Sequence, residues 1–220
     1  MEPGNRSFLY QNRLYLGVYL LLLALAAALQ IVYSPTALLL WINRHWHPAA
    51  DVFFRAVTFL GDGLFCVGVA LLLCLYSLRQ AFLVVVGYVV SGLLAQTGKR
   101  LLFPHAPRPA RYFDDILSAL HTVPGVELHQ FGSFPSGHTA TAFALFTVLA
   151  FETKHPLCKP LWLVPAVLVA YSRVYLLQHF VLDVTVGSLV GVLTVLLVYP
   201  YRNRFPDYRP MRWLPRQPQV

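Results

Sequence analysis

Six apolar runs, separated by short polar segments, constrain this chain more than any other feature. A helix that crosses the ~30 Å hydrocarbon core of a bilayer needs about 20 apolar residues, and most of the runs approach that length. Only 12% of the 220 residues are charged, against about 25% in typical soluble domains. The sequence therefore predicts an all-α, polytopic membrane protein with six transmembrane helices, over residues 14–34, 62–78, 81–102, 137–151, 161–177 and 180–200.

The last two of these helices come from one uninterrupted apolar stretch, residues 161–200. As a single helix it would be about 60 Å long, twice the hydrocarbon thickness, so it must turn back. Neither Gly nor Pro lies between Ala166 and Val186 to mark the turn. We place it at one membrane surface, at the polar cluster near the middle of the stretch: Ser172, Arg173, Gln178 and His179.

The polar connections differ in character. Residues 35–63 are aromatic-rich and only intermittently charged, which predicts one or two interfacial helices with Trp41 and Trp46 at headgroup level. Five prolines exclude a continuous helix from residues 103–136. No internal repeat is visible, so residues 1–220 are predicted to form a single integral membrane domain.

The cations indicate how the chain is oriented. Of the 17 Lys and Arg, 14 are Arg, and many of these cations flank apolar runs. This pattern is typical of cations that set the orientation of a chain in the membrane, and it gives no reason to expect a nucleic-acid partner. With six spans both termini share a side. That side carries ten cations, five of them in a basic, Pro-rich tail over 201–220, and the other carries seven. We therefore predict that both termini lie in the cytoplasm, and we expect the membrane to be a bacterial-type inner membrane.

On this topology three motif-like segments meet at the outer face: residues 99–109 (KRLLFPHAPRP), 134–140 (FPSGHTA) and 172–183 (SRVYLLQHFVLD). Cations beside a helix N-terminus predict an anion site, most simply for phosphate. Ser136 is a natural N-cap, and Gly137 allows close approach to the backbone. Arg108 and Arg173 can each bind phosphate oxygens through two N–H groups.

Two histidines add chemistry to this anion site. His179 and Asp183 are spaced i, i+4 and share one helix face. A carboxylate that accepts one imidazole N–H leaves the other nitrogen free as a nucleophile. His138, from a different span, could protonate the leaving oxygen as a general acid. No metal-binding Cys/His spacing is present, so we expect neither a metal nor a cofactor.

These residues resemble the type-2 phosphatidic acid phosphatase superfamily, whose three motifs are K-x6-RP, PSGH and SR-x5-H-x3-D. The second motif is present as residues 135–138, and the third is complete, with Ser172, Arg173, His179 and Asp183. The first departs from the pattern, because Leu101 stands seven residues before Arg108. An insertion of two residues would give the lysine role to Lys99, and Arg100 could also fill it.

The resemblance implies a metal-independent hydrolase that acts through a phosphohistidine on His179, with His138 exchanging protons. Its substrate would be a phosphate or diphosphate on an outer-leaflet lipid. The short loops favour a simple lipid phosphate or diphosphate. Undecaprenyl diphosphate is the first candidate, while lipid A phosphates, phosphatidylglycerol phosphate and phosphatidic acid stay open. A non-catalytic binder or carrier of anionic lipids is the alternative class, but it would have no use for an oriented nucleophile opposite an acid. The oligomeric state is left open.

Overall fold

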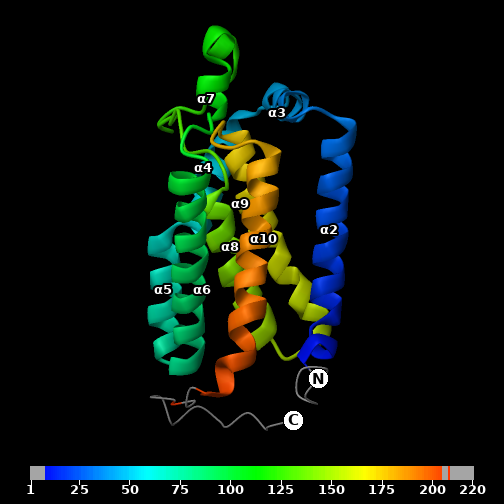
Figure 1. Cartoon of the computed structure of the whole chain (residues 1–220), viewed down its shortest axis with the longest axis vertical. Coiled ribbons are helices and arrows are strands. Elements are labelled where there is room, and N and C mark those ends of the chain that lie inside the picture. The colour runs from blue at the N-terminus through cyan, green and yellow to red at the C-terminus, as the bar shows by residue number, and fades with distance from the viewer. Residues whose placement is uncertain (1–7, 205–207, 209–220) are drawn as a thin grey trace.

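The computed structural model describes residues 8–204 and residue 208. Within them the chain is helical, and the only β pairing is an isolated bridge between Pro107 and Phe131, which confirms the predicted all-α class. Long helices run side by side along one axis (Figure 1). They are α2 (Arg13–Val32), α5 (Gly63–Cys74), α6 (Leu78–Thr97), α8 (Gly137–Glu152), α9 (Leu163–Tyr175) and α10 (Val181–Val198).

Every predicted span coincides with one of these helices, but length and composition support fewer crossings than six. Among the described residues four helical segments are long and apolar enough to cross a membrane: Arg13–Val32, Leu78–Leu102, Pro156–Tyr175 and Val181–Arg204. A fifth candidate is the pair Pro48–Gly61 and Gly63–Cys74, bent by 59°. The remaining helix, α8, has only 16 residues. The structure thus shows a helical membrane protein with four or five candidate spans.

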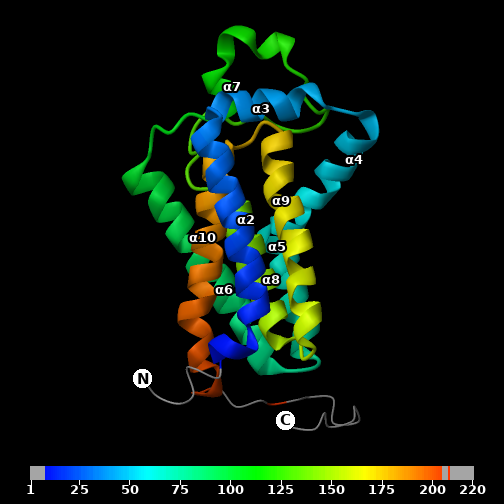
Figure 2. The same ribbon diagram turned by 90° about the vertical axis from the view of Figure 1, so that its right-hand side faces the viewer.

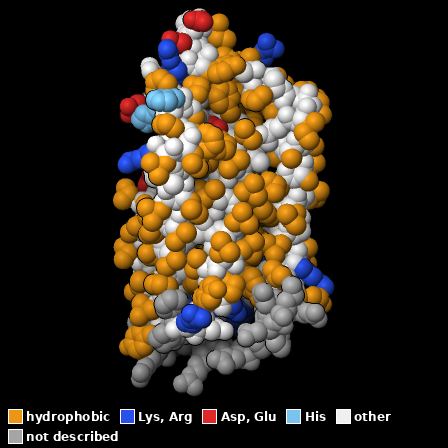
Figure 3. Space-filling model, in the orientation of Figure 1, with side chains coloured by type: hydrophobic (Ala, Val, Ile, Leu, Met, Phe, Trp, Pro, Cys, Tyr) orange, Lys and Arg blue, Asp and Glu red, His pale blue; other side chains and the backbone are white. Residues whose placement is uncertain are grey.

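The surface fits this reading. Hydrophobic side chains cover the flank of the helices, whereas charged side chains gather at the two ends (Figure 3). Helix α2 has only 11% of its apolar window buried inside the protein, so most of it faces outward. Helix α8 is the opposite case, because 12 of its 16 residues are buried. It is the centre of the bundle, with α6, α9 and α10 packed around it.

Two glycines bring α10 against the first turns of α8. A Cβ on Gly187 would lie 2.6 Å from the Ser136 carbonyl oxygen, and one on Gly191 would lie 2.8 Å from the Ala144 nitrogen. Helices in membranes approach this closely where small residues recur four apart. The Ser136 N–H also donates to the Asp183 carbonyl oxygen (3.0 Å). This contact places the PSGH segment beside the start of α10.

The turn between α9 and α10 includes Gln178 and His179 of the predicted polar cluster, whereas Ser172 and Arg173 belong to α9. Helix α9 continues through Ser172 and Arg173 to Tyr175, and the chain reverses at Leu176–Phe180. Leu177 takes a left-handed conformation, with φ of 55°, which costs a residue with a Cβ about 1–2 kcal/mol. Its side chain is 1% exposed in an apolar cluster. Burial of Leu177 therefore holds a turn for which glycine would be the usual residue.

The connections form the two ends of the molecule. As predicted, two helices, α3 (Pro35–Arg44) and α4 (Pro48–Val57), follow α2, and α3 crosses over the helix ends (Figure 2). Residues 103–136 contain only short helices, α7 (Pro109–Tyr112) and η3 (Asp114–Ala119), and α7 lies at the same end of the molecule as α3 (Figure 1).

The described chain near its two ends meets away from these connections. Phe8 stacks on Tyr199 with ring centroids 5.3 Å apart. The start of α2 and the end of α10 lie at the opposite end of the bundle from α3 and α7 (Figure 1). Of the predicted tail, the first four residues complete η5 (Tyr199–Arg204), and the Leu78 N–H donates to the Tyr208 carbonyl oxygen (3.1 Å). The rest of the tail lies outside the described residues.

Candidate active site

A cavity of about 540 Å³ brings the predicted site residues together. Its lining includes Lys99, Arg108, His138, Arg173 and His179, which come from five different segments, and Gly137. A larger, mostly apolar cavity of about 1010 Å³ lies between α2 and α9/α10 and shares no lining residue with it in the described chain. The smaller cavity is therefore where the chemistry-bearing side chains converge.

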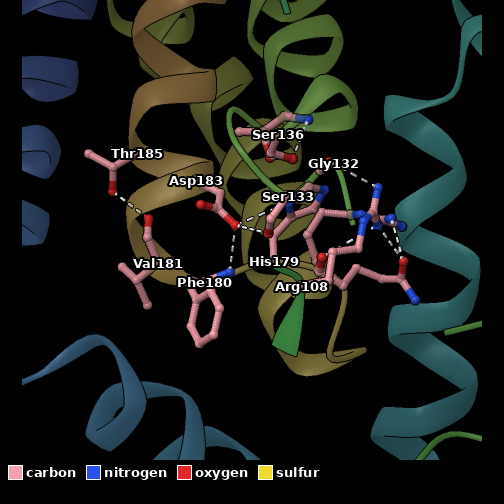
Figure 4. Close-up of polar contacts among 12 residues, drawn as sticks. Arg108, Gly132, Ser133, Ser136, His179, Phe180, Val181, Asp183 and Thr185 are labelled. Carbon is pink, nitrogen blue, oxygen red and sulfur yellow. Dashed lines mark hydrogen bonds and ion pairs between the residues drawn. The ribbon is translucent and has the colours of Figure 1, made fainter. Parts of the chain in front are cut away.

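His179 and Asp183 form a buried pair behind this cavity. The His179 Nδ1 lies 3.3 Å from the Asp183 Oδ2, which also accepts from the Ser133 hydroxyl and the Phe180 N–H (2.9 Å). Figure 4 shows these contacts converging on the carboxylate. An acceptor at Nδ1 places the imidazole proton there and leaves Nε2 as the basic nitrogen. Burial first, and then the nearby cations led by Arg173, lower the pKa of His179 well below its usual value, which favours the neutral, nucleophilic imidazole.

Arg108 and Arg173 lie side by side and share an acceptor. Both guanidinium groups donate to Gln178 Oε1, at 2.8 Å from Arg108 and 3.4 Å from Arg173. Arg108 Nε also donates to the Phe131 carbonyl (3.0 Å), and Arg173 Nη1 to the Thr58 hydroxyl (2.8 Å). Burial lowers the pKa of Arg108, yet arginine remains charged near neutral pH.

One hydrogen-bond donor of the two arginines has no acceptor among the described residues. Arg173 Nε is buried and has no hydrogen-bond partner among the residues that the structure describes. Buried donors are nearly always satisfied, so such a group calls for a specific explanation. An anion in the adjoining cavity would supply the missing acceptor.

The start of α8 provides the second part of the anion site. Ser136 is fully buried and caps the helix, since its Oγ accepts from the Thr139 N–H (3.4 Å). A Cβ added to Gly137 would meet no described atom within 4 Å, so the backbone here borders open space. His138 is 37% exposed at the side chain, and its Nε2 lies 3.9 Å from Asp62 Oδ2. Asp62 caps α5 through the Leu64 N–H (2.8 Å).

The structure separates the two candidate cations of the first motif. Lys99 lines the cavity and is half-buried, whereas Arg100 is exposed and is not among the lining residues. Both lie in a π-helical turn, η2 (Gly98–Leu102), closed by the Phe103 N–H on the Gly98 carbonyl (2.8 Å). A π turn takes in one more residue than an α turn and often marks a functional site. It accounts for part of the unusual spacing between Lys99 and Arg108.

Sequence reasoning missed several residues that complete this site. Gln178 and Thr58 orient the arginines, and Ser133 holds Asp183. His129, which belongs to no motif, lines the cavity. Gln178 had a sequence signal, because an amide at the centre of an apolar stretch must have a polar partner. Thr58 and Ser133 had none, since small hydroxyl residues in polar segments are ordinary.

Comparisons with known proteins identify the family. A model of the PAP2 superfamily matches residues 80–207. The chain is 34% identical over 133 residues to the bacitracin transport permease protein BcrC of Bacillus licheniformis, covering 54% of this chain and 64% of the relative, slightly under two thirds of that protein's length. It is 30% identical over 185 residues to the lipid A 4'-phosphatase of Porphyromonas gingivalis, covering 80% of this chain and 75% of the relative.

Two solved structures share the fold. The crystal structure of Aquifex aeolicus LpxE matches with a TM-score of 0.65 and 30% identity, over 74% of this chain and 93% of that one. The PAP2 type phosphatidylglycerolphosphate phosphatase of Bacillus subtilis matches with a TM-score of 0.61 and 26% identity, over 88% of this chain and 98% of that one. The chain belongs to the PAP2 superfamily and is a membrane phosphatase.

Proposed function

We propose that this protein removes a phosphate group from an outer-leaflet lipid through a phosphohistidine on His179. The observation that carries the proposal is a buried imidazole, held by Asp183 at Nδ1, that lines a cavity containing three cationic side chains. Nucleophilic catalysis by histidine needs an orienting partner on one nitrogen and free access to the other. The Asp183 contact and the place of His179 in the cavity lining support both conditions.

The reaction has two steps. His179 Nε2 attacks phosphorus and forms an N–P bond as the P–O bond to the lipid breaks, and His138 gives a proton to the leaving oxygen. Water then attacks the phosphohistidine while His138 takes a proton back, which releases inorganic phosphate and restores His179. Lys99, Arg108, Arg173 and the first turn of α8 stabilise the charge that develops on the phosphoryl oxygens.

We propose that these cations do the work that a metal ion does in other phosphatases. In the described part of the chain no group of three His, Cys, Asp or Glu side chains could hold a metal ion. The cationic clamp already offers three positive charges at one cavity, enough for a phosphate monoester or for the larger charge of a diphosphate.

The cavity also suggests how a lipid reaches the site. Beyond the cations its lining follows α6 through Gln96, Leu93, Gly92, Val89 and Tyr88, inside a candidate membrane span. Leu93 is 62% exposed and Val89 45% exposed, so both face outward. A lipid whose phosphate lies at Lys99 and whose hydrocarbon chain lies along α6 would contact both the cationic part of the cavity and the part lined by α6. We propose this arrangement, with six membrane crossings, cytoplasmic termini in an inner membrane and the site on the outer face.

Among lipid phosphates we propose a lipid A phosphate first, because the lipid A 4'-phosphatase relative aligns with most of this chain. Undecaprenyl diphosphate is the second candidate. The observation in its favour is the number of cations around the cavity.

The test is phosphate release in detergent from lipid A, undecaprenyl diphosphate, phosphatidylglycerol phosphate and phosphatidic acid, with EDTA present. We expect turnover of at least one lipid, fastest for lipid A, and none in the His179→Ala variant, which leaves no acceptor for the phosphoryl group. Activity of His179→Ala would contradict the nucleophile assignment. Activity that EDTA abolishes and Mg²⁺ restores would contradict the metal-free clamp. Faster turnover of a lipid other than lipid A would change only the substrate that we propose.

A further inference from the structure

Gln178 lies between the two arginines of the site and belongs to none of the three motifs. We propose that it is a positioning residue that holds Arg108 and Arg173 together, ready for the phosphate, without neutralising either charge. This inference rests on the proposed function, since it assumes that the two arginines bind the phosphoryl group.

The contacts of Gln178 determine which way its amide faces. The side chain is 2% exposed, and its Nε2 donates to the Glu127 carbonyl oxygen at 2.8 Å. A carbonyl can only accept, so the nitrogen must lie on that side and Oε1 must face the arginines. The second contact agrees, because Oε1 accepts from Arg108 Nη1 (2.8 Å) and from Arg173 Nη2 (3.4 Å). The Gln178 backbone carbonyl adds a longer contact to Arg108 Nη1 (3.4 Å).

An amide oxygen suits this position for an electrostatic reason. Two guanidinium groups that share one acceptor repel each other, and the repulsion grows when water is excluded. A carbonyl dipole stabilises both groups, and hydrogen bonds to charged partners are the stronger kind. A carboxylate would stabilise them further, but it would form ion pairs and compete with the substrate phosphate. The neutral acceptor keeps the cationic field of the cavity while fixing its geometry.

Thr58 and Phe131 complete this arrangement from outside. Thr58 Oγ1 accepts from Arg173 Nη1 and the Phe131 carbonyl accepts from Arg108 Nε, so each guanidinium is held from two directions. Arg173 Nε remains unpaired among the described residues. Donors held in place before the anion arrives need no reorganisation during the reaction. Gln178 is the residue that couples the two arginines.

A simpler role must be distinguished from this one. Gln178 could serve only to tie the segment around Glu127 to the end of α9 through its Nε2. Gln178→Met preserves the length of the side chain but loses both the donor and the acceptor. Gln178→Glu loses the donor, keeps an acceptor and adds a negative charge. A pure tether would suffer equally from both changes, whereas the proposed role predicts that they differ.

The experiment measures inhibition by orthovanadate, which stands in for the phosphoryl group, together with kcat and KM on the active lipid. We expect Gln178→Met to raise the vanadate inhibition constant and lower kcat/KM by about 10- to 100-fold. Gln178→Glu should raise the vanadate inhibition constant at least about 10-fold further, because the negative charge of the Glu side chain would lie where the anion binds. The control, Gln80→Met, removes a comparable amide hydrogen bond to Glu152 away from the site and should stay within about 3-fold.

Unchanged vanadate affinity in Gln178→Met, or equal losses in the Met and Glu variants, would overturn the proposal. Melting curves in detergent identify a variant that fails to fold. In that case Gln178→Asn, whose shorter side chain withdraws the acceptor, must show the raised constant instead. His179→Ala and Arg173→Ala are assayed in parallel: if they retain turnover, the proposed site itself is wrong. If they lose it while the Gln178 variants behave as wild type, only this inference is refuted.

Discussion

At the scale of single residues, Asp183 has more partners than its motif suggests. Its Oδ2 accepts from His179 Nδ1, Ser133 Oγ and the Phe180 N–H, so it orients the proposed nucleophile and also fixes the first turn of α10. The i, i+4 spacing predicted the contact with His179, although His179 lies in the turn before α10 and does not share a helix face with Asp183. The contact with Ser133 spans 50 residues of sequence, and no local pattern could have indicated it.

The first prediction concerns this carboxylate. Asp183→Asn should lower kcat by about 10³- to 10⁴-fold, because an amide can stabilise the wrong tautomer of His179. The vanadate inhibition constant should stay within about 10-fold of the wild-type value, since the cations that bind vanadate are unchanged. Ser133→Ala is the matched control, which removes one donor and should cost less than about 10-fold in kcat. A two-fold effect of Asp183→Asn would mean that Asp183 serves the fold alone.

The second prediction separates the two cations of the first motif. Lys99 lines the cavity and Arg100 does not. Loss of a charge-assisted contact that strengthens in the transition state costs about 2–4 kcal/mol, or roughly 30- to 1,000-fold in rate. We therefore expect Lys99→Ala to reduce kcat/KM by that factor and Arg100→Ala to stay within a few-fold. The reverse result would give the role to Arg100, and two mild variants would leave Arg108 as the only cation from this motif.

The third prediction is a pH dependence. Burial, followed by Arg173, Arg108 and Lys99, lowers the pKa of His179 below 6.5. His179 is therefore still unprotonated, and active as a nucleophile, when pH falls to 6.5, and it loses activity only at lower pH. The acid limb of kcat/KM, which reports the free enzyme, should lie below 6.5 after correction for ionisation of the lipid phosphate. An enzyme group that titrates at or above 6.5 on this limb would contradict the environment described for His179.

At the scale of elements, the helices followed from the apolar runs, but their contacts did not. The sequence predicts a short membrane span at the position of α8, and only the packing shows that this helix is the buried centre of the bundle. The turn after α9 contains the predicted polar residues Gln178 and His179, but α9 continues through Ser172 and Arg173 to Tyr175 and the chain reverses around Leu177. Burial of Leu177 overrides its backbone preference, which is a tertiary effect.

The fourth prediction tests the α8–α10 contact. Gly191→Ala would place a Cβ against the backbone of Ala140 and Ala144, and such overpacking costs about 1–3 kcal/mol. We expect a lower melting temperature in detergent and reduced turnover, because α10 carries Asp183. Gly17→Ala in α2, where a Cβ meets no described atom within 4 Å, should leave the melting temperature unchanged or raised. Equal behaviour of the two variants would show that close approach at Gly191 is unimportant.

At the scale of the whole molecule, the candidate site and the first and last long helix ends lie at opposite ends of the bundle. The start of α2 and the end of α10 lie at one end, and α7, whose N-cap is Arg108, lies at the other (Figure 1). The excess of cations near the chain ends predicts that this end faces the cytoplasm. The site would then face the outer leaflet, where it can act only on lipids exposed there.

The fifth prediction tests this orientation. In a variant with Cys66, Cys74 and Cys158 replaced by Ala, single cysteines are introduced at two exposed positions, Ser118 in η3 and Lys154 after α8. A membrane-impermeant maleimide should label Ser118→Cys in intact cells and Lys154→Cys only after permeabilisation. The opposite pattern would place the site on the cytoplasmic face and would exclude outer-leaflet substrates.

The class of the protein and the position of its apolar helices could be predicted from the sequence, as could the candidate site residues Arg108, His138, Arg173, His179 and Asp183. Each of these depends on local chemistry: apolar length, helical spacing or residues adjacent in the chain. Only the tertiary structure shows that Lys99 lines the cavity while Arg100 does not, that α8 lies at the centre, and that Gln178 lies between two arginines. Those features depend on distances between segments far apart in the sequence, and such distances are fixed only when the side chains of all the helices pack together.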